Sequence, residues 1–170
     1  MIIIGYQGIG KSSIAGRNYV IDLESGNFWF AGKRRKEWYV YYCNIAEHLS
    51  EQGYIVFVSS HKVVREYLHN YSKQSLYIVF PAVELKEEWV KRLQDRFNRT
   101  KLEKDLKAWK NAEERYKINI TDLKKSGIQF YEITDMDYRL QDIVDYLVGF
   151  DFEWRIKNNM KISVDRVENV

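Results

Sequence analysis

The sequence has little cysteine, little proline and no long hydrophobic run, and each shortage excludes a class of protein. Cys43 is the only cysteine among 170 residues, which excludes an intramolecular disulfide and favours a reducing compartment. No apolar run approaches the roughly 18 residues of a membrane span. The apolar residues 1–4 are too short for a signal sequence and have no basic leader. We therefore expect a cytoplasmic protein with no membrane partner.

A strong excess of charge of either sign is also missing. The 27 basic and 24 acidic side chains leave a formal net charge of +3, which is too balanced for a surface that coats nucleic acid. Nucleic acid is therefore not the partner that we predict, although a phosphate-binding cleft fits this charge. Aromatic residues make up 15% of the chain. They suit either a core or stacking on bases, and we favour the core.

Short β-branched runs alternate with segments of helical periodicity along the chain. Strands are predicted at residues 1–4, 19–23, 54–58, 76–80 and 128–133. Helices are predicted over residues 12–15 and 37–52, after a cap at Ser59 or Ser60, from residue 84, from a capping box of Thr100 and Glu103, and from a cap at Thr134 or Asp135 through Leu147. Residues 25–35 are predicted to be a loop. This order predicts a three-layer α/β/α fold with a five-stranded, mostly parallel sheet.

The domain organisation follows from the lack of any repeat or linker, and we predict one domain over residues 1–170. The helices in residues 84–125 exceed what a crossover between parallel strands needs, so we interpret them as a lid. The tail after Gly149 contains residues 161–164, which could add an edge strand or pair with a second copy. The sequence therefore leaves a homo-oligomer open.

A glycine-rich loop follows the first predicted strand. Gly5, Gly10, Lys11 and Ser12 satisfy the phosphate-loop pattern G-x-x-x-x-G-K-[ST]. Glycines allow backbone N–H groups to approach phosphate oxygens, and a helix that begins near Gly10 adds its positive end. Lys11 is predicted to contact the β- and γ-phosphates and Ser12 to bind magnesium. The predicted nucleotide-binding set is Gly5, Gly8, Ile9, Gly10, Lys11, Ser12 and Ser13.

With Gly8 included, the string Gly5-x-x-Gly8-x-Gly10-Lys11-Ser12 resembles the loop of nucleoside monophosphate kinases and shikimate-kinase-like enzymes. The resemblance is specific over eight residues and otherwise rests on the order of elements. It implies ATP and Mg²⁺ as cofactors and transfer of the γ-phosphoryl group to a small acceptor opposite the loop. The implied fold is that of the small phosphate-loop kinases.

Asp22 and Glu24 alternate at the end of the second predicted strand, where they should border the loop. Shikimate-kinase-like proteins are similar here, with an acid-x-acid pair near the acceptor and the metal. The resemblance makes Asp22 the first candidate for organising the metal or activating the acceptor, and Glu24 a candidate for contacting the acceptor. The alternative is a solvated strand end.

The third predicted strand departs from the usual pattern, because no acid follows it. Most phosphate-loop enzymes place an aspartate there to hold the magnesium shell, whereas this chain continues Ser59-Ser60-His61-Lys62. His61, Lys62 and Arg65 become candidates for contacting the acceptor or its phosphate, or are surface and capping residues. The missing acid leaves the strength of catalysis open and leaves Asp22 to compensate.

Arg92, Arg96 and Arg99 are spaced by four and three residues, so one helix face should present all three. In nucleoside monophosphate kinases the lid falls at this point of the chain, and its arginines close over the transferring phosphate. By this resemblance Arg92 and Arg96 join Lys11 and Asp22 as predicted catalytic residues, with Arg99 a weaker candidate. A solvated helix face is the alternative.

A basic cluster at residues 33–36 lies beside Trp29, Phe30 and Trp38. It is interpreted first as a solvated loop and second as part of an acceptor site, while contact with nucleic acid has weaker support.

The leading hypothesis is a kinase that uses ATP and Mg²⁺ to phosphorylate a (deoxy)nucleoside monophosphate. The rival is an NTP-binding switch or accessory protein with weak or no kinase activity, and an ATPase acting on nucleic acid fits poorly. The acceptor and the choice between ATP and GTP stay open.

Overall fold

The computed structural model describes residues 1–16, 19–30 and 33–157. The chain divides into two compact units, residues 1–138 and 139–170. Each unit is described by itself below.

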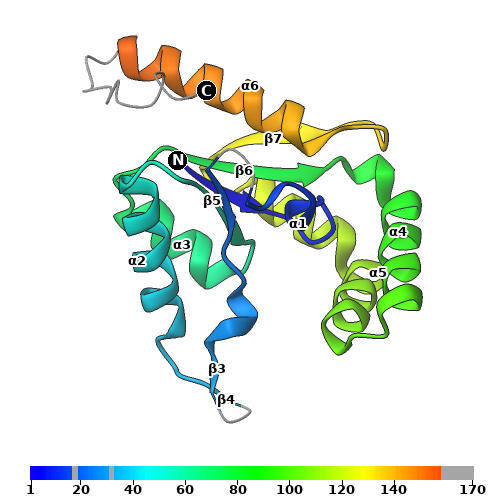
Figure 1. Ribbon diagram of the computed structural model, residues 1–170. Helices are drawn as coiled ribbons and strands as arrows, with labels where there is room; N and C mark the ends of the chain where they lie inside the picture. Colours follow the sequence, from blue (N-terminus) through cyan, green and yellow to red (C-terminus); the bar gives the residue numbers. More distant parts are fainter. Residues whose placement is uncertain (17–18, 31–32, 158–170) are drawn as a thin grey trace. The chain divides into compact units, whose positions relative to one another are not determined.

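The first unit is built on a five-stranded, all-parallel sheet (Figure 1). Its strands are β1 (Ile2–Gly5), β2 (Val20–Asp22), β5 (Ile55–Ser59), β6 (Leu76–Pro81) and β7 (Gln129–Ile133), in the order β2-β5-β1-β6-β7. The parallel α/β architecture predicted from the sequence is confirmed. β1 lies at the centre because its Ile2, Ile3 and Ile4 are apolar on both faces and are wholly buried. Gly5 pairs with Ser59, the last residue of β5, and with Val79 of β6, so the loop after β1 starts between these two strands.

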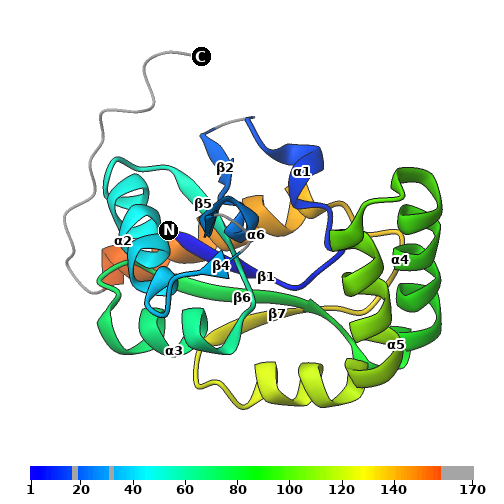
Figure 2. The ribbon, with the colours of Figure 1, turned by 90° about the horizontal axis from the view of Figure 1, so that it is seen from below.

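Five α-helices of the first unit connect these strands: α1 (Lys11–Ile14), α2 (Trp38–Glu51), α3 (Lys62–Tyr71), α4 (Lys86–Thr100) and α5 (Glu103–Lys124). A 3₁₀ turn over Ser25–Phe28 precedes β3 (Trp29–Phe30), and a second one over Val83–Leu85 precedes α4. Figures 1 and 2 show α4 and α5 side by side, next to the loop that follows β1. Trp89 and Leu93 of α4 and Tyr116 of α5 are wholly or almost wholly buried. The segment predicted as a lid therefore contributes large side chains to the core.

The second unit contains α6 (Leu140–Lys157). Its buried residues Leu140, Ile143, Val144 and Leu147 follow the spacing of one helix face. The sheet and helices are compatible with three layers, and the three-layer arrangement itself stays a prediction. The predicted strand at residues 161–164 lies outside the described residues.

Several predicted boundaries were wrong. Residues 25–35 are not only a loop, because β3 (Trp29–Phe30) and β4 (Lys33–Arg34) form an antiparallel pair that extends away from the sheet (Figure 1). The helix predicted to start at Thr134 or Asp135 begins at Leu140, since the Asp135 carboxylate instead accepts the N–H of Asp137 in a turn.

The caps of two other helices were also wrong. Neither Ser59 nor Ser60 caps α3, whose N-cap is His61 without a side-chain hydrogen bond. The capping box at Thr100 does not form, because Thr100 is the last residue of α4 and its hydroxyl donates to Asp105.

Among the described residues, none of the helices has both the length and the hydropathy that a membrane span requires.

Candidate functional site

The glycine-rich loop lies between the end of β1 and the start of α1. A Cβ added at Gly5 would lie 2.8 Å from Ile9 Cδ1 and 2.9 Å from Lys11 Cδ, so both side chains would have to move to accommodate it. Gly8 has a φ of +88°, which disfavours any residue with a Cβ. A Cβ there would also approach Leu93 Cδ2 to 2.9 Å. The glycine pattern therefore has a steric cause as well as the predicted role in approaching phosphate.

The hydroxyls of Ser12 and Ser13, which follow Lys11, differ in their hydrogen bonding. Ser13 donates its hydroxyl to the Gly10 carbonyl at 2.7 Å, which closes the first turn of α1. Ser12 is exposed and, within the part of the chain that the structure describes, makes no side-chain hydrogen bond. Because α1 is a single turn, its dipole is small, and the charge of the loop rests on Lys11 and the backbone N–H groups.

Lys11 and Asp22 are brought together, as predicted for the acid at the end of β2. Lys11 Nζ lies 3.5 Å from Asp22 Oδ1, and the Asp22 side chain is only 9% exposed. Asp22 Oδ1 is buried without a hydrogen bond. Burial raises the pKa of Asp22 above its ordinary value, although the Lys11 ammonium opposes the shift. A carboxyl group whose charged form is disfavoured by burial is typical of functional sites.

Asp22→Asn is expected to be no less stable than the wild type near neutral pH. The raised pKa means that the folded protein binds this proton more tightly than the unfolded chain does. The stability that Asp22 contributes is therefore present below its ordinary pKa and is lost as the pH rises through the raised value. Urea unfolding between about pH 3.5 and 7.5 should show the variant gaining stability relative to the wild type as the pH rises.

Asp95→Asn, on an exposed position of α4, is the matched control and should follow the wild type at every pH. If Asp22→Asn instead loses stability relative to the wild type with rising pH, the attraction to Lys11 outweighs burial.

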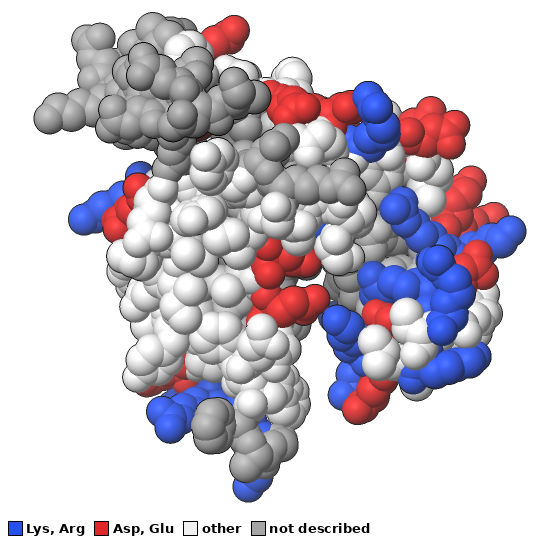
Figure 3. Space-filling view, viewed as in Figure 1, with Lys and Arg blue, Asp and Glu red and all other residues white. Residues whose placement is uncertain are grey.

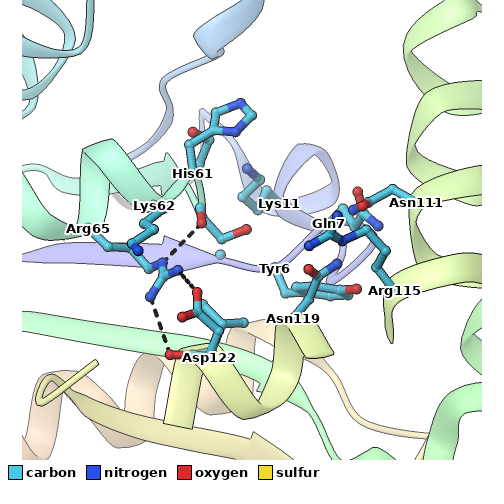
Figure 4. Close-up of a pocket in the computed structure, with 14 residues that line it drawn as sticks. Tyr6, Gln7, Lys11, His61, Lys62, Arg65, Asn111, Arg115, Asn119 and Asp122 are labelled. Carbon is cyan, nitrogen blue, oxygen red and sulfur yellow. Dashed lines mark hydrogen bonds and ion pairs between the residues drawn. The ribbon is translucent and has the colours of Figure 1, made fainter. Parts of the chain in front are cut away.

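A cleft of about 430 Å³ opens beside the loop, at the carboxyl ends of β1 and β5. Its lining comes from the loop, the β5–α3 connection and one side of α5. Figure 4 shows Arg65 and Asp122 at one end of the cleft and Asn111 and Arg115 at the other, with Lys11 between them. Most of the lining is polar, and the cations outnumber the single lining carboxylate, Asp122. The cleft is therefore suited to an anionic ligand.

Arg65, predicted to contact the acceptor, has a structural partner. It is 6% exposed and forms an ion pair with the Asp122 carboxylate. Its Nε also donates to the Ser60 carbonyl at 3.1 Å. Arg65 thus joins the β5–α3 connection to α5 and shapes one end of the cleft. Lys62 is exposed and forms only an open ion pair with Glu66 at 3.7 Å, so its ammonium can reach a ligand.

Three residues on α5 were missed by sequence reasoning. Asn111, Arg115 and Asn119 recur every four residues, so they share the helix face that lines the cleft. Arg115 is exposed and has no ion-pair partner among the residues described. This spacing was visible in the sequence, but the stripe lies among many lysines and glutamates. It offers one guanidinium between two amides.

His61 lies at the rim of the cleft beside an aromatic cluster. Its ring packs edge-on against Trp38 with centroids 5.7 Å apart. The Arg34 guanidinium stacks on the two tryptophans of this cluster, 4.1 Å from the Trp38 ring centroid and 5.3 Å from the Trp29 ring centroid. Burial, and then the charges of Arg34 and Lys11, lower the pKa of His61. At neutral pH His61 is therefore a neutral donor or acceptor.

Glu24 lies outside the cleft lining. Its carboxylate is exposed and forms an ion pair with Lys104 at the start of α5, at 3.4 Å. Figure 3 shows charged side chains crowded over α4 and α5, whereas the surface over α2 carries few. The Glu24–Lys104 pair connects the end of β2 to this charged surface.

The three arginines of α4 do not present their guanidinium groups to one common site. Arg92 lies over the rings of Trp89 and Tyr138, and its Nη2 is 3.9 Å from the position of a Cβ at Gly10. Arg96 forms an ion pair with the buried Asp105 of α5 at 2.9 Å. Arg99 is exposed and donates to the carbonyl of Asp95 within its own helix. Only Arg92 lies at the loop.

The remaining sequence features are structural here. Cys43 is buried, and burial raises the pKa of its thiol to about 12, which excludes a ready nucleophile.

The described residues contain no group of three or more His, Cys, Asp or Glu side chains arranged for a metal. A magnesium ion that also has phosphate and water ligands needs fewer protein ligands. The Asp22 carboxylate, which is buried, makes no hydrogen bond through Oδ1 and is ion-paired only loosely with Lys11, suits it together with the Ser12 hydroxyl.

Neither the models of known protein families nor the curated proteins contain a match to this chain.

Proposed function

We propose that this protein binds ATP on the loop of residues 5–13 and transfers the γ-phosphoryl group to a (deoxy)nucleoside monophosphate. The observation that carries the proposal is the pairing of two cationic positions across one cleft. Lys11 lies on the loop side, and the unpaired Arg115 lies on α5. A cleft of about 430 Å³ is within the range of small-molecule sites. Two anionic groups brought together in it would have separate cationic partners.

The loop holds the donor in this proposal. Its N–H groups and the Lys11 ammonium bind phosphate oxygens and so orient the terminal phosphorus toward the cleft. Arg92, held over the Trp89 and Tyr138 rings beside Gly10, stabilises the negative charge that spreads over the transferring group. Ser12 and Asp22 would hold Mg²⁺, which neutralises phosphate charge when it is bound.

The acceptor occupies the far wall of the cleft. Arg115 can bind a phosphate monoester through two parallel N–H groups, and Lys62, on the β5–α3 side of the cleft, offers a second point charge to an anionic ligand. Asn111 and Asn119 each offer an amide that can donate and accept hydrogen bonds to a sugar or base. His61 lies on the β5–α3 connection, across the cleft from α5, and its neutral ring suits a hydrogen bond to the acceptor. Catalysis then comes mainly from positioning and charge stabilisation.

One observation favours the second candidate, an NTP-binding switch with weak or no kinase activity. β5 ends in Ser59, and Ser60 and His61 follow it, so this strand supplies no carboxylate to a magnesium shell. The lining carboxylate, Asp122, is already paired with Arg65. The two candidates share the donor site and differ in whether the cleft takes an acceptor.

The test is a coupled assay of ATP consumption with a panel of nucleoside monophosphates, deoxynucleoside monophosphates and nucleosides. We expect turnover that requires a monophosphate, and Arg115→Ala should raise KM for that acceptor by about 10- to 100-fold, because a charged hydrogen-bonding group is lost. Lys110→Ala, one turn away and paired with Glu113, is the control and should match the wild type. Nucleotide binding without acceptor-dependent turnover would establish the switch instead.

A further inference from the structure

Two aromatic residues far apart in the sequence donate hydrogen bonds to the loop backbone. Trp89 Nε1 donates to the Gln7 carbonyl at 2.9 Å. The Tyr138 hydroxyl donates to the Ile9 carbonyl at 2.9 Å. The two rings stack, with centroids 6.1 Å apart and planes 14° apart. Burial raises the pKa of Tyr138, which keeps its hydroxyl protonated as a donor.

The position of these two bonds has a direct effect on the loop. In a trans peptide the C=O and the following N–H point in opposite directions. A donor on the Gln7 carbonyl therefore turns the Gly8 N–H to the other side of the loop, and a donor on the Ile9 carbonyl does the same for the Gly10 N–H. Within the described chain, neither glycine N–H donates to a backbone carbonyl. Both are left for a ligand on the concave side.

Other contacts of the same cluster oppose rotation of these peptides. The Gln7 side chain donates to the Ala108 carbonyl of α5 at 2.9 Å. Gly8 packs directly against Leu93 and the Trp89 indole, and this close approach is possible because glycine has no Cβ. Arg92 is held over both aromatic rings, 5.1 Å from the Trp89 centroid and 5.3 Å from that of Tyr138.

We propose that Trp89 and Tyr138 are positioning residues for phosphate binding, because they hold the Gln7 and Ile9 carbonyls outward and so present the Gly8 and Gly10 N–H groups to the phosphates. The proposal rests on the proposed function only in assigning phosphate as the ligand of the loop. The order that the two bonds impose on the loop is a property of the free protein. Neither residue contacts the phosphate itself.

Tyr138→Phe keeps the stacked ring and removes the hydroxyl, which bonds to the Ile9 carbonyl and to the Arg92 side chain. Loss of one neutral hydrogen bond is worth about 1 kcal/mol, so Kd should rise about 5- to 10-fold for ATP and equally for inorganic tripolyphosphate. Isothermal titration measures both. The matched control is Tyr116→Phe, which keeps the ring that packs edge-on against Tyr6 of the loop and removes only the hydroxyl that donates to the Ala82 carbonyl at 2.8 Å. The control should lower Tm and leave both Kd values unchanged.

The outcomes separate this proposal from the function on which it rests. Equal affinity of Tyr138→Phe and wild type overturns it, and so does a loss confined to ATP, which would place the hydroxyl on the nucleoside. A wild type that binds neither probe overturns the proposed function. In that case hydrogen exchange in the free protein decides the positioning role. Faster exchange of the Gly8 and Gly10 amides in Tyr138→Phe than in Tyr116→Phe supports it, and equal exchange overturns it.

Discussion

Lys11→Met is expected to lower acceptor-dependent ATP turnover by about 100- to 1,000-fold, the range for removing one group that stabilises developing charge. The lysine stem packs against Gly5 inside the loop, and methionine retains most of that stem while it removes the ammonium. The loss should therefore come from charge and not from collapse of the loop. The same coupled assay, run with saturating acceptor, measures the effect on kcat.

The control for this variant must remove a lysine charge elsewhere. Lys107→Met suits, because Lys107 is exposed and forms an ion pair with Glu103 within α5. Its turnover should equal that of the wild type. If Lys11→Met retains more than about a tenth of the wild-type turnover, a smaller loss than one charge-stabilising donor gives, Lys11 has no role in the chemistry.

Trp89→Ala is expected to lower the free energy of unfolding by about 3–5 kcal/mol, as large-to-small changes at buried aromatic positions do. The Trp89 side chain is 0% exposed, and its loss also leaves the Gln7 carbonyl without its donor. The residue joins α4 to the loop, so the damage should reach nucleotide binding as well. Chemical denaturation followed by circular dichroism measures the loss of stability.

Trp109→Ala provides a comparison on the neighbouring helix. Trp109 is only half-buried and stacks on Phe97 with centroids 5.9 Å apart, and its indole N–H makes no hydrogen bond to the described residues. Trp109→Ala should lower the free energy of unfolding by less than half as much as Trp89→Ala does. Equal losses for the two variants would contradict a special role for the contact between α4 and the loop.

The sheet could be predicted because its strands are short apolar runs whose pattern depends little on the neighbours. Residues 2–4 read as a buried strand in any parallel sheet, and they form β1 at its centre. Helix starts were harder, because a cap is decided by one hydrogen bond. Thr100 had the right spacing to Glu103, yet its hydroxyl donates to the buried Asp105 instead.

In the candidate site, residue positions that follow from the local backbone could be predicted from the sequence. Positions that depend on how a second helix packs could not. The loop motif placed Lys11, and strand alternation placed Asp22 beside it. Helical spacing predicted one face for Arg92 and Arg96, but spacing does not reveal that α5 supplies Asp105 to Arg96. For the same reason the α5 residues that line the cleft, Arg115 among them, require the packing of α5 on the sheet to be known.

The central place of β1 has a consequence for how the chain is made. The strand β1 and its loop are synthesised before the partners on which they depend: Ser59 and Val79 for pairing, Trp89 and Tyr138 for the loop carbonyls. At ordinary elongation rates these arrive on the order of ten seconds after the loop itself. During synthesis the isoleucines of β1 therefore stay exposed to other chains and to chaperones until the later strands emerge.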